Sequence, residues 1–346
     1  MILSPASAAE KILRGEIVAL PTETVYGLAA LAENPEAVTK IFAAKNRPPD
    51  NPLICHVDSL AMIREYAAPV PDYLDALVHH FSPGPLSFLL HIPENSPLRF
   101  ATAGRASCIF RIPRHPLFLR VIQQVRKPLA APSANTSGHV SPTTAQMVES
   151  DLGNKISGTV DGGPCAVGIE STILDCRESN RVAILRTGKI GKEELEKILS
   201  PLHVDCVTLS ASRDSTDNST SEKIPGESYR HYAPKTKLIL IARSAIQSLG
   251  SNDLLIASDE DLHEWDQAMQ TPSSAYQRGQ AQPTPRIPSI SLGSVSRPDE
   301  MARHLYQNLS RVDSLQVPKA FLVLPELDDS SLSDAIIDRL RKASAL

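Results

Sequence analysis

The chemistry available to this chain lies in short clusters of polar residues that flank apolar runs. The first cluster, residues 21–28 (PTETVYGL), follows the apolar run 17–20 and packs three hydroxyls and one carboxylate into five positions. Loops at strand ends are where α/β folds place their ligands, so these groups could hold a small zwitterion. A turn bounded by Pro21 and Gly27 would use the same residue types, and the cluster by itself leaves both interpretations open.

The second cluster, residues 45–53 (KNRPPDNPL), sets two cations beside a loop that contains three prolines. Because proline fixes φ, this loop should restrict the mobility of Lys45 and Arg47. Preorganised cations of this kind suit a triphosphate, since arginine offers a bidentate fork and lysine a point charge. A solvated loop with two surface cations is the alternative interpretation.

The third cluster, residues 107–116 (SCIFRIPRHP), contains an arginine inside an apolar run. If residues 108–112 form a strand, Ser107, Ile109 and Arg111 share one of its faces. A guanidinium in such a place is costly unless it meets an anion. This cluster therefore favours an anion-binding site at Arg111.

The fourth cluster, residues 131–138 (APSANTSG), again ends an apolar run. Its small hydroxyl and amide side chains would let backbone N–H groups approach a phosphate or a base. It is neither a P-loop nor a dinucleotide-binding glycine motif, and clusters of this composition are usually turns. Two further polar segments, 168–172 and 184–188, also adjoin predicted strands.

The third and fourth clusters lie in a segment, residues 95–148, that contains no Asp or Glu but six Arg and one Lys. The average acid content of the chain predicts about six acids there. The whole chain has a net charge of −4, so the segment suits a small anion better than a long polyanion. We therefore expect the segment to line a site for a small anion, which nearby acids would weaken.

Composition excludes several classes of protein. The chain has 346 residues, 42% of them hydrophobic and 21% charged, as in ordinary globular proteins. No apolar run is long enough for a membrane span, and the start lacks the features of a signal peptide. The number of cysteines is odd, and no CxxC motif occurs, which argues against a disulfide framework and against a zinc site. Free thiols favour a reducing compartment such as the cytoplasm. The cysteines are Cys55, Cys108, Cys165, Cys176 and Cys206.

Short apolar runs alternate with helix signals over the first 200 residues. Three helices, 6–14, 35–45 and 143–150, are each preceded by Ser-Pro or Asn-Pro, a cap followed by proline at the first helical position. The apolar runs are too short for helices and predict strands. This pattern indicates an α/β fold with a mixed sheet. The expected strands are 17–20, 53–57, 86–91, 108–112, 129–131, 172–174 and 182–185.

Three regions follow from these elements: a larger α/β domain at 1–209, a linker at 210–236 and a smaller α/β domain at 237–346. The linker begins with the polar, Ser/Thr-rich segment 210–222. In the second domain we expect a loop at 271–288, which is rich in Pro, Gln and Ser. The remaining elements are four strands, 237–241, 254–257, 290–292 and 320–324, and two helices, 298–312 and 332–345.

Taken together, the clusters resemble the signature of the Sua5/YrdC/YciO family of threonylcarbamoyl-AMP synthases. The matching segments occur in family order at 22–28, 45–53, 83–87, 111–116, 132–138, 170–175 and 186–188. Residues 225–234 resemble the interdomain linker of the long, Sua5-type branch, and 336–343 its final helix. The resemblance implies a YrdC-like mixed twisted sheet, joined by the linker to a smaller Rossmann-like Sua5 domain.

The resemblance also implies a reaction and a set of contacts. The family condenses L-threonine, bicarbonate or CO2 and ATP into threonylcarbamoyl-AMP and pyrophosphate. Mg2+ is held mainly by ATP, and no residue acts as a dedicated acid or base. A downstream complex transfers the product's threonylcarbamoyl group to adenosine 37 of tRNA. The implied threonine contacts are Thr24, His56, Arg111 and Ser171. The implied ATP or adenylate contacts are Lys45, Arg47, Asn51, Ser107, Ser133, Asn135, Ser141 and Arg186, with Tyr232 of the linker closing over the nucleotide.

Some positions depart from the family pattern, and two other functions are compatible with the fold. Glu227 stands where the family's linker usually has methionine, and Ser82, Ser87 and Thr187 replace Trp, Thr and Pro. An RNA-binding module without synthase activity is one alternative, although the chain lacks aromatics interleaved with its basic residues. A carbamoyl-handling maturation factor is another, although the cysteine spacing of its zinc fingers is absent. The sequence leaves open whether the chain itself contacts tRNA.

Overall fold

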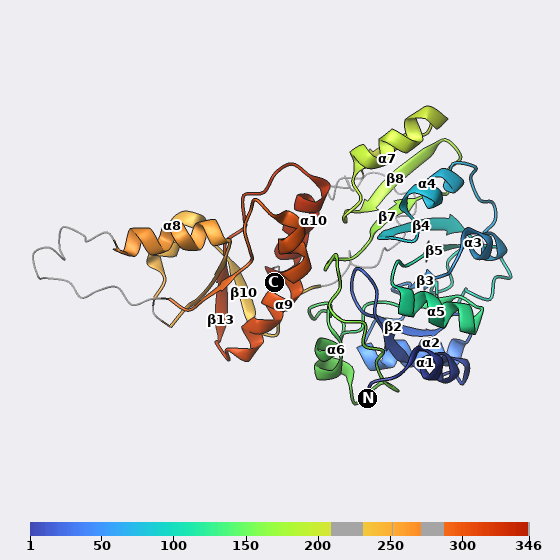
Figure 1. Ribbon diagram of the computed structural model, residues 1–346, viewed down its shortest axis with the longest axis horizontal. Helices are drawn as coiled ribbons and strands as arrows, with labels where there is room; N and C mark the ends of the chain where they lie inside the picture. The colour runs from blue at the N-terminus through green and yellow to red at the C-terminus, as the bar shows by residue number, and fades with distance from the viewer. Residues whose placement is uncertain (209–230, 251, 271–286, 345–346) are drawn as a thin grey trace, which may run out of the picture. The chain divides into compact units, whose positions relative to one another are not determined.

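The computed structural model describes residues 1–208, 231–250, 252–270 and 287–344. The chain divides into two compact units, drawn in Figure 1. The first comprises Met1–Ser137 and Ser141–Tyr229, and the second Gly138–Val140 and Arg230–Leu346. Most of the predicted linker, including Glu227, and all but the last two residues of the predicted loop at 271–288 lie outside the described residues.

A nine-stranded sheet forms the centre of the first unit, with strand order β1-β2-β6-β3-β5-β4-β7-β8-β9. The pairs β3–β5, β4–β7 and β8–β9 are parallel and the others antiparallel, which confirms the predicted mixed sheet. The strands are β1 (Val18–Leu20), β2 (Gly27–Leu31), β3 (Ile54–His56), β4 (Leu86–His91), β5 (Ser107–Arg111), β6 (Leu129–Ala130), β7 (Thr172–Asp175), β8 (Arg181–Arg186) and β9 (Asp205–Thr208).

Two buried apolar clusters hold helices against this sheet. The larger includes residues of α2, α4 and α7 together with alternate strand residues such as Phe88 and Phe110. The smaller joins α1 and α5 to the residues of β1, β2 and β6 that point the other way. The helices are α1 (Pro5–Leu13), α2 (Pro35–Lys45), α3 (Leu60–Tyr66), α4 (Leu74–Phe81), α5 (Pro116–Val125), α6 (Ala145–Leu152) and α7 (Lys192–Leu199), with the short 3-10 helix η1 (Ser200–Leu202).

Local capping explains where the predicted helices begin. The side chains of Ser4 and Asn34 cap α1 and α2, as the sequence predicts. The predicted cap at Ser141-Pro142 is wrong. Instead, the Thr144 side chain accepts a hydrogen bond from the backbone N–H of Met147 and starts α6 at Ala145. Ser141 is not needed as a cap, so its hydroxyl is available for a contact elsewhere.

Thr144→Ala is expected to lower the free energy of unfolding by about 0.5–2 kcal/mol, because the first turn of α6 loses its side-chain acceptor. Urea denaturation of both proteins measures the difference. Thr39→Ala, at an exposed position inside α2, is the matched control. Equal destabilisation by the two substitutions would contradict the capping role.

The second unit contains a four-stranded sheet of order β10-β13-β11-β12 in which every pair is parallel. All four predicted strands and both predicted helices are present, with bounds shifted by a residue or two. Within the described part of the chain, no helix combines the length and apolar character needed to cross a bilayer. The elements are β10 (Lys237–Leu240), η2 (Arg243–Ser248), β11 (Leu254–Ala257), α8 (Asp259–Gln270), β12 (Ser289–Ser291), α9 (Pro298–Ser314), β13 (Lys319–Leu322) and α10 (Ser331–Ser344).

Candidate functional site

Three neighbouring strands of the first unit present polar side chains in one row. His56 on β3 pairs in register with Arg111 on β5, and Arg111 pairs with Ser87 on β4. Residues in register on adjacent strands point to the same face of a sheet. The same face carries a small apolar cluster that includes Ile54 and Ile109, two residues before His56 and Arg111 on their strands. The row is therefore a buried polar strip beside an apolar patch.

Arg111 is buried, and its partner comes from the first cluster. Its Nη2 lies 2.8 Å from Glu23 Oε1, with side chains 5% and 8% exposed. Its Nε donates to the carbonyl of Gly84 at 3.3 Å, and Glu23 Oε2 accepts the N–H of Arg114 at 2.9 Å. The expectation of an anion at Arg111 is met by an acid of the chain itself. Our interpretation that acids stay away from this pocket is therefore wrong at this position.

Ser171 and Arg186 lie beside this row. Ser87 Oγ and Ser171 Oγ are 2.8 Å apart, so the two hydroxyls share a hydrogen bond. Arg186 donates from Nε to the Ser171 carbonyl at 3.0 Å and from Nη2 to the Ser171 hydroxyl at 3.1 Å. A Cβ on Gly188 would lie 2.5 Å from the backbone N of Thr172, so only glycine allows this approach of β8 to β7.

Lys45, the last residue of α2, is buried rather than solvated. Its Nζ donates to the carbonyls of Ser133 and Asn135, both at 2.5 Å. Burial and the neighbouring Arg47 guanidinium lower the pKa of Lys45 well below its usual value. The lysine thus fixes the backbone of the 131–138 loop, which the sequence treated as a separate cluster.

Arg47 organises the proline-containing loop that follows α2. Its Nη2 donates to Asn51 Oδ1 at 2.6 Å and to the Pro52 carbonyl at 2.9 Å, and its Nε to the Asn51 carbonyl at 3.2 Å. The predicted pair Arg47 and Asn51 is therefore brought together by direct contact. The alternative of two independent surface cations does not hold for Lys45, whose side chain is buried.

The remaining predicted residues of this unit are also buried or nearly so. Thr24 shares a hydrogen bond of 2.8 Å with the Thr22 hydroxyl, which also donates to the Val25 carbonyl. Ser141 donates to Glu170 Oε1 at 2.8 Å, a second acid from outside the acid-free segment. Ser107 starts β5, at the end of the strand away from Arg111.

Backbone hydrogen bonds and one side-chain ion pair join the clusters into one region around residues 21–28. The 131–138 loop reaches it through a bridge between Gly27 and Ser133, and the Leu28 N–H donates to the Pro132 carbonyl. The third cluster reaches it through Arg111 and Glu23. The segment 83–87 contacts the third cluster, because the Gly84 N–H donates to the Ile112 carbonyl. It also contacts β7, because the Thr172 N–H donates to the Pro85 carbonyl. Neither Glu23 nor Ser87 was predicted as a site residue, although both lie in quoted motifs.

Tyr232 belongs to the second unit. Its ring stacks on Tyr306 with centroids 5.6 Å apart, and the Arg339 guanidinium lies 5.7 Å from its centroid. Its backbone has a φ of 64°, a left-handed conformation. Tyr232 is thus anchored by helices α9 and α10 of its own unit.

His56 packs its ring against Phe118, with ring centroids 5.0 Å apart. Its Nδ1 is buried and has no hydrogen-bond partner among the described residues. Burial, together with the Arg111 charge, lowers the pKa of His56 to about 3. The imidazole therefore stays neutral in this buried row.

The buried His56 makes stability depend on pH in a defined direction. Its pKa is lower in the folded chain than in the unfolded one, so below about pH 6.5 the unfolded state takes up a proton that the folded state refuses. As the pH is lowered below that value, the free energy of unfolding is expected to decrease by up to about 1.4 kcal/mol per pH unit. Urea denaturation between pH 7 and 4.5 should show a shallower slope for His56→Gln. His80→Gln, at an exposed histidine, is the control, and equal slopes for His56→Gln and the unsubstituted chain would contradict the assignment.

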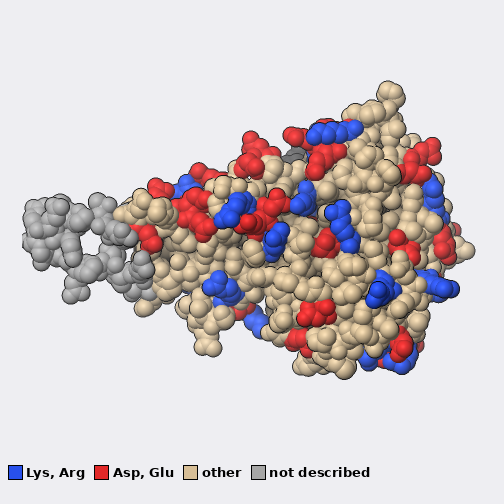
Figure 2. Space-filling view, in the orientation of Figure 1, with Lys and Arg blue, Asp and Glu red and all other residues tan. Residues whose placement is uncertain are grey.

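The charged side chains around this region are paired with one another or interspersed. Within the described residues, no three His, Cys, Asp or Glu side chains gather as they would around a metal ion. Two cations of the acid-free segment, Arg111 and Lys127, pair with Glu23 and Glu33 from outside it. On the face drawn in Figure 2, basic and acidic side chains are interspersed.

The mixed sheet, its buried polar strip and the smaller parallel-sheet unit define a YrdC-like α/β protein with a Rossmann-like domain appended. Comparison with known families agrees. A family model for Sua5, YciO and YrdC proteins, described as telomere recombination, matches residues 10–188, and one described as the C-terminal domain of threonylcarbamoyl-AMP synthase matches residues 190–345.

Full-length relatives specify the family. A threonylcarbamoyl-AMP synthase of Bacillus subtilis is 36% identical over 98% of this chain and 92% of its own length, and one of Pyrococcus abyssi is 36% identical over 97% and 93%. The crystal structure of P. abyssi Sua5 complexed with L-threonine has a TM-score of 0.78 at 32% identity, covering 98% of this chain and 94% of that one. The chain belongs to the Sua5-type threonylcarbamoyl-AMP synthases, nucleotidyltransferases of tRNA modification.

Proposed function

We propose that this chain condenses L-threonine, bicarbonate or CO2 and ATP into threonylcarbamoyl-AMP, with release of pyrophosphate. The observation that carries the proposal is the buried Arg111–Glu23 ion pair, which lies in register with the neutral ring of His56. A cation and an anion held side by side can recognise both charges of an amino acid. The likeness to a relative that binds L-threonine supports the same substrate.

In this proposal the threonine carboxylate binds the Arg111 guanidinium in place of Glu23. The hydroxyls of Thr24 and Ser171 and the neutral ring of His56 then contact the rest of the amino acid. Ser87 and Arg186 hold Ser171 in place through the hydrogen bonds described above. Glu23, released from Arg111, can accept a hydrogen bond from the threonine ammonium group.

ATP binds, in this proposal, along the 45–53 and 131–138 segments. The proposed contacts to ATP or the adenylate come from Lys45, Arg47, Asn51, Ser107, Ser133, Asn135, Ser141 and Arg186. Lys45 serves this site through the 131–138 loop, whose carbonyls it holds. Tyr232 closes over it. In this proposal Mg2+ enters as part of the substrate, bound to the triphosphate oxygens.

The reaction then needs positioning more than acid–base catalysis. The threonine amine, once deprotonated, adds to CO2 to form a carbamate. A carbamate oxygen attacks the α-phosphorus, the bond to the β-phosphate oxygen breaks, and pyrophosphate leaves. Three anions must be held close together, and fixed cations offset their repulsion. Holding the reactants in contact can supply an effective molarity of roughly 10⁵ M or more.

The product is a reactive mixed anhydride, so we propose that it is handed on in the cytoplasm to a complex that transfers the threonylcarbamoyl group to adenosine 37 of tRNA. Direct contact of this chain with tRNA belongs to the same proposal. Neither partner is needed for pyrophosphate release, so the synthase step is testable with this chain alone.

The test is a single incubation with ATP, Mg2+, bicarbonate and L-threonine in which pyrophosphate is followed. Release should depend on both threonine and bicarbonate. Release that persists without either of them, or no release with all four, would overturn the proposal. A steep salt dependence of RNA affinity without pyrophosphate release would favour an RNA-binding module instead.

A further inference from the structure

The sheet of the second unit changes its winding direction between β10 and β13. These strands are neighbours and parallel, although they are the first and last of the sheet in the sequence. After β10 the chain enters η2, which packs with α8 in one apolar cluster. After β13 the chain enters α10, which contacts α9 and β10. Figure 1 shows α8 on one side of this sheet and α9 and α10 on the other side. In open parallel sheets, ligands bind in the crevice that such a divergence opens at the carboxyl ends of the strands.

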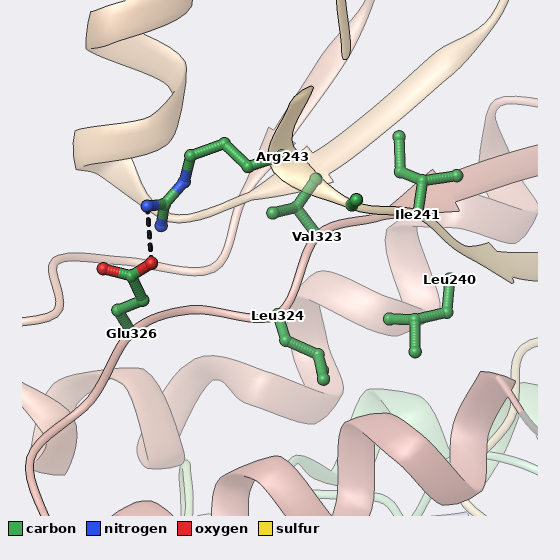
Figure 3. A pocket seen from close by; sticks show the side chains of 7 residues that line it. Leu240, Ile241, Arg243, Val323, Leu324 and Glu326 are labelled. Atoms are coloured by element: carbon green, nitrogen blue, oxygen red, sulfur yellow. Dashed lines mark hydrogen bonds and ion pairs between the residues drawn. The ribbon is translucent and has the colours of Figure 1, made fainter. Parts of the chain in front are cut away.

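A pocket of about 420 Å3 lies at this point. Its size falls in the range of roughly 300–1,000 Å3 that is typical of small-molecule sites. The lining comes from Leu240–Arg243, which ends and follows β10, and from Val323, Leu324 and Glu326, which follow β13. Figure 3 shows the aliphatic side chains around one part of the pocket and the Arg243–Glu326 pair at its other end.

The charged end of the pocket is built from one fixed and one loosely held ion pair. Arg243 is held by Asp261, whose side chain is 2% exposed and accepts a hydrogen bond of 2.8 Å from the Ser258 hydroxyl. Its Nη1 lies 2.7 Å from Oε1 of Glu326, whose side chain is 81% exposed. A surface pair of this kind contributes little free energy, so a ligand can separate its members at small cost. When Glu326 is displaced, the ion pair with the buried Asp261 still holds the Arg243 guanidinium in place.

We propose that this pocket binds an α-amino acid with an aliphatic side chain. The ligand's carboxylate pairs with Arg243, its ammonium group pairs with Glu326, and its side chain lies against Leu240 and Leu324. Arg243, Asp261 and Glu326 together carry a net charge of −1, which disfavours nucleotide phosphates at the same place. A zwitterion supplies both opposite charges and no net charge.

The single tryptophan of the chain is a built-in reporter for this site. Trp265 belongs to the same apolar cluster as Val323, and Ile241 packs against that cluster. Titration of the full chain with L-leucine is expected to give a saturable change in tryptophan emission, with matching heat in isothermal titration calorimetry. The analogues 4-methylpentanoate, which lacks the ammonium group, and 3-methylbutylamine, which lacks the carboxylate, should each bind at least about 10-fold more weakly.

Substitutions locate the binding on the chain. Glu326→Gln and Arg243→Gln should each weaken L-leucine binding at least about 10-fold. Arg297→Gln, at an exposed Arg–Glu pair elsewhere in the same unit, is the matched control and should bind normally. Arg243→Gln also removes the cation that pairs with the buried carboxylate of Asp261, so it can destabilise the fold. Glu326 is exposed, so Glu326→Gln is the decisive variant. No saturable signal by either method, unchanged affinity in Glu326→Gln, or equal affinity for the analogues would each overturn the proposal, whether or not the chain releases pyrophosphate.

Discussion

Arg111→Ala is expected to reduce threonine-dependent pyrophosphate release on the order of 1,000-fold while ATP affinity is largely kept. The guanidinium is buried in the polar strip with His56 and Ser87, where it would hold the threonine carboxylate. Pyrophosphate release measures turnover, and isothermal titration calorimetry measures ATP binding. Loss of ATP binding in this variant would show that Arg111 serves the other substrate.

The ion pair complicates this experiment, and a second variant resolves it. Alanine at 111 leaves Glu23 buried without its cation, which typically costs about 3–5 kcal/mol of folding free energy. The double variant Glu23→Gln with Arg111→Gln replaces both charges by amides of similar size. It should recover most of the stability to urea but none of the turnover. Recovery of turnover together with stability would reduce Arg111 to a structural role.

Lys45→Met is expected to weaken ATP binding by about 100-fold. The Nζ of Lys45 joins the carbonyls of Ser133 and Asn135, so its loss leaves two buried acceptors unpaired and frees the 131–138 loop. Methionine keeps the volume of the buried side chain, which limits damage to the core. Calorimetric titration with MgATP measures the effect, and the melting temperature shows whether the domain remains folded.

The same helix offers a matched control. Lys40→Met removes an exposed lysine of α2 whose Nζ donates to the Gly15 carbonyl, so ATP affinity should be unchanged. If Lys45→Met binds ATP as tightly as Lys40→Met, the loop does not contact the nucleotide in the manner proposed.

The Arg111–Glu23 pair shows how far charge counting along the chain can reach. The absence of acids from residues 95–148 indicated an anion-binding wall, and Arg111 is indeed buried there. Yet Glu23 and Glu170 reach Arg111 and Ser141 from segments outside that stretch. Separation along the chain does not bound separation in space, so a local gap in acids could not exclude acidic neighbours.

The sequence by itself determined the family, the α/β class and most strands, because the motifs are local and short apolar runs between Pro and Gly restrict the backbone strongly. It also determined that Arg111 needs an anion, since a guanidinium on an apolar strand cannot stay unpaired. It missed β2, whose small residues Gly27–Leu31 lack a periodic pattern, and it also missed β9 (Asp205–Thr208). It misplaced the cap of α6.

Only the tertiary structure decided which anion Arg111 meets, that Lys45 fixes the 131–138 loop, and that Ser87 and Ser171 share a hydrogen bond. It also decided that Arg243 and Glu326, which follow the first and the last strand of the second sheet, line one pocket. These contacts depend on strand order and register, which bring together residues up to 90 positions apart. The free energy that sets the order comes from burial of the whole sheet, and no local pattern encodes it.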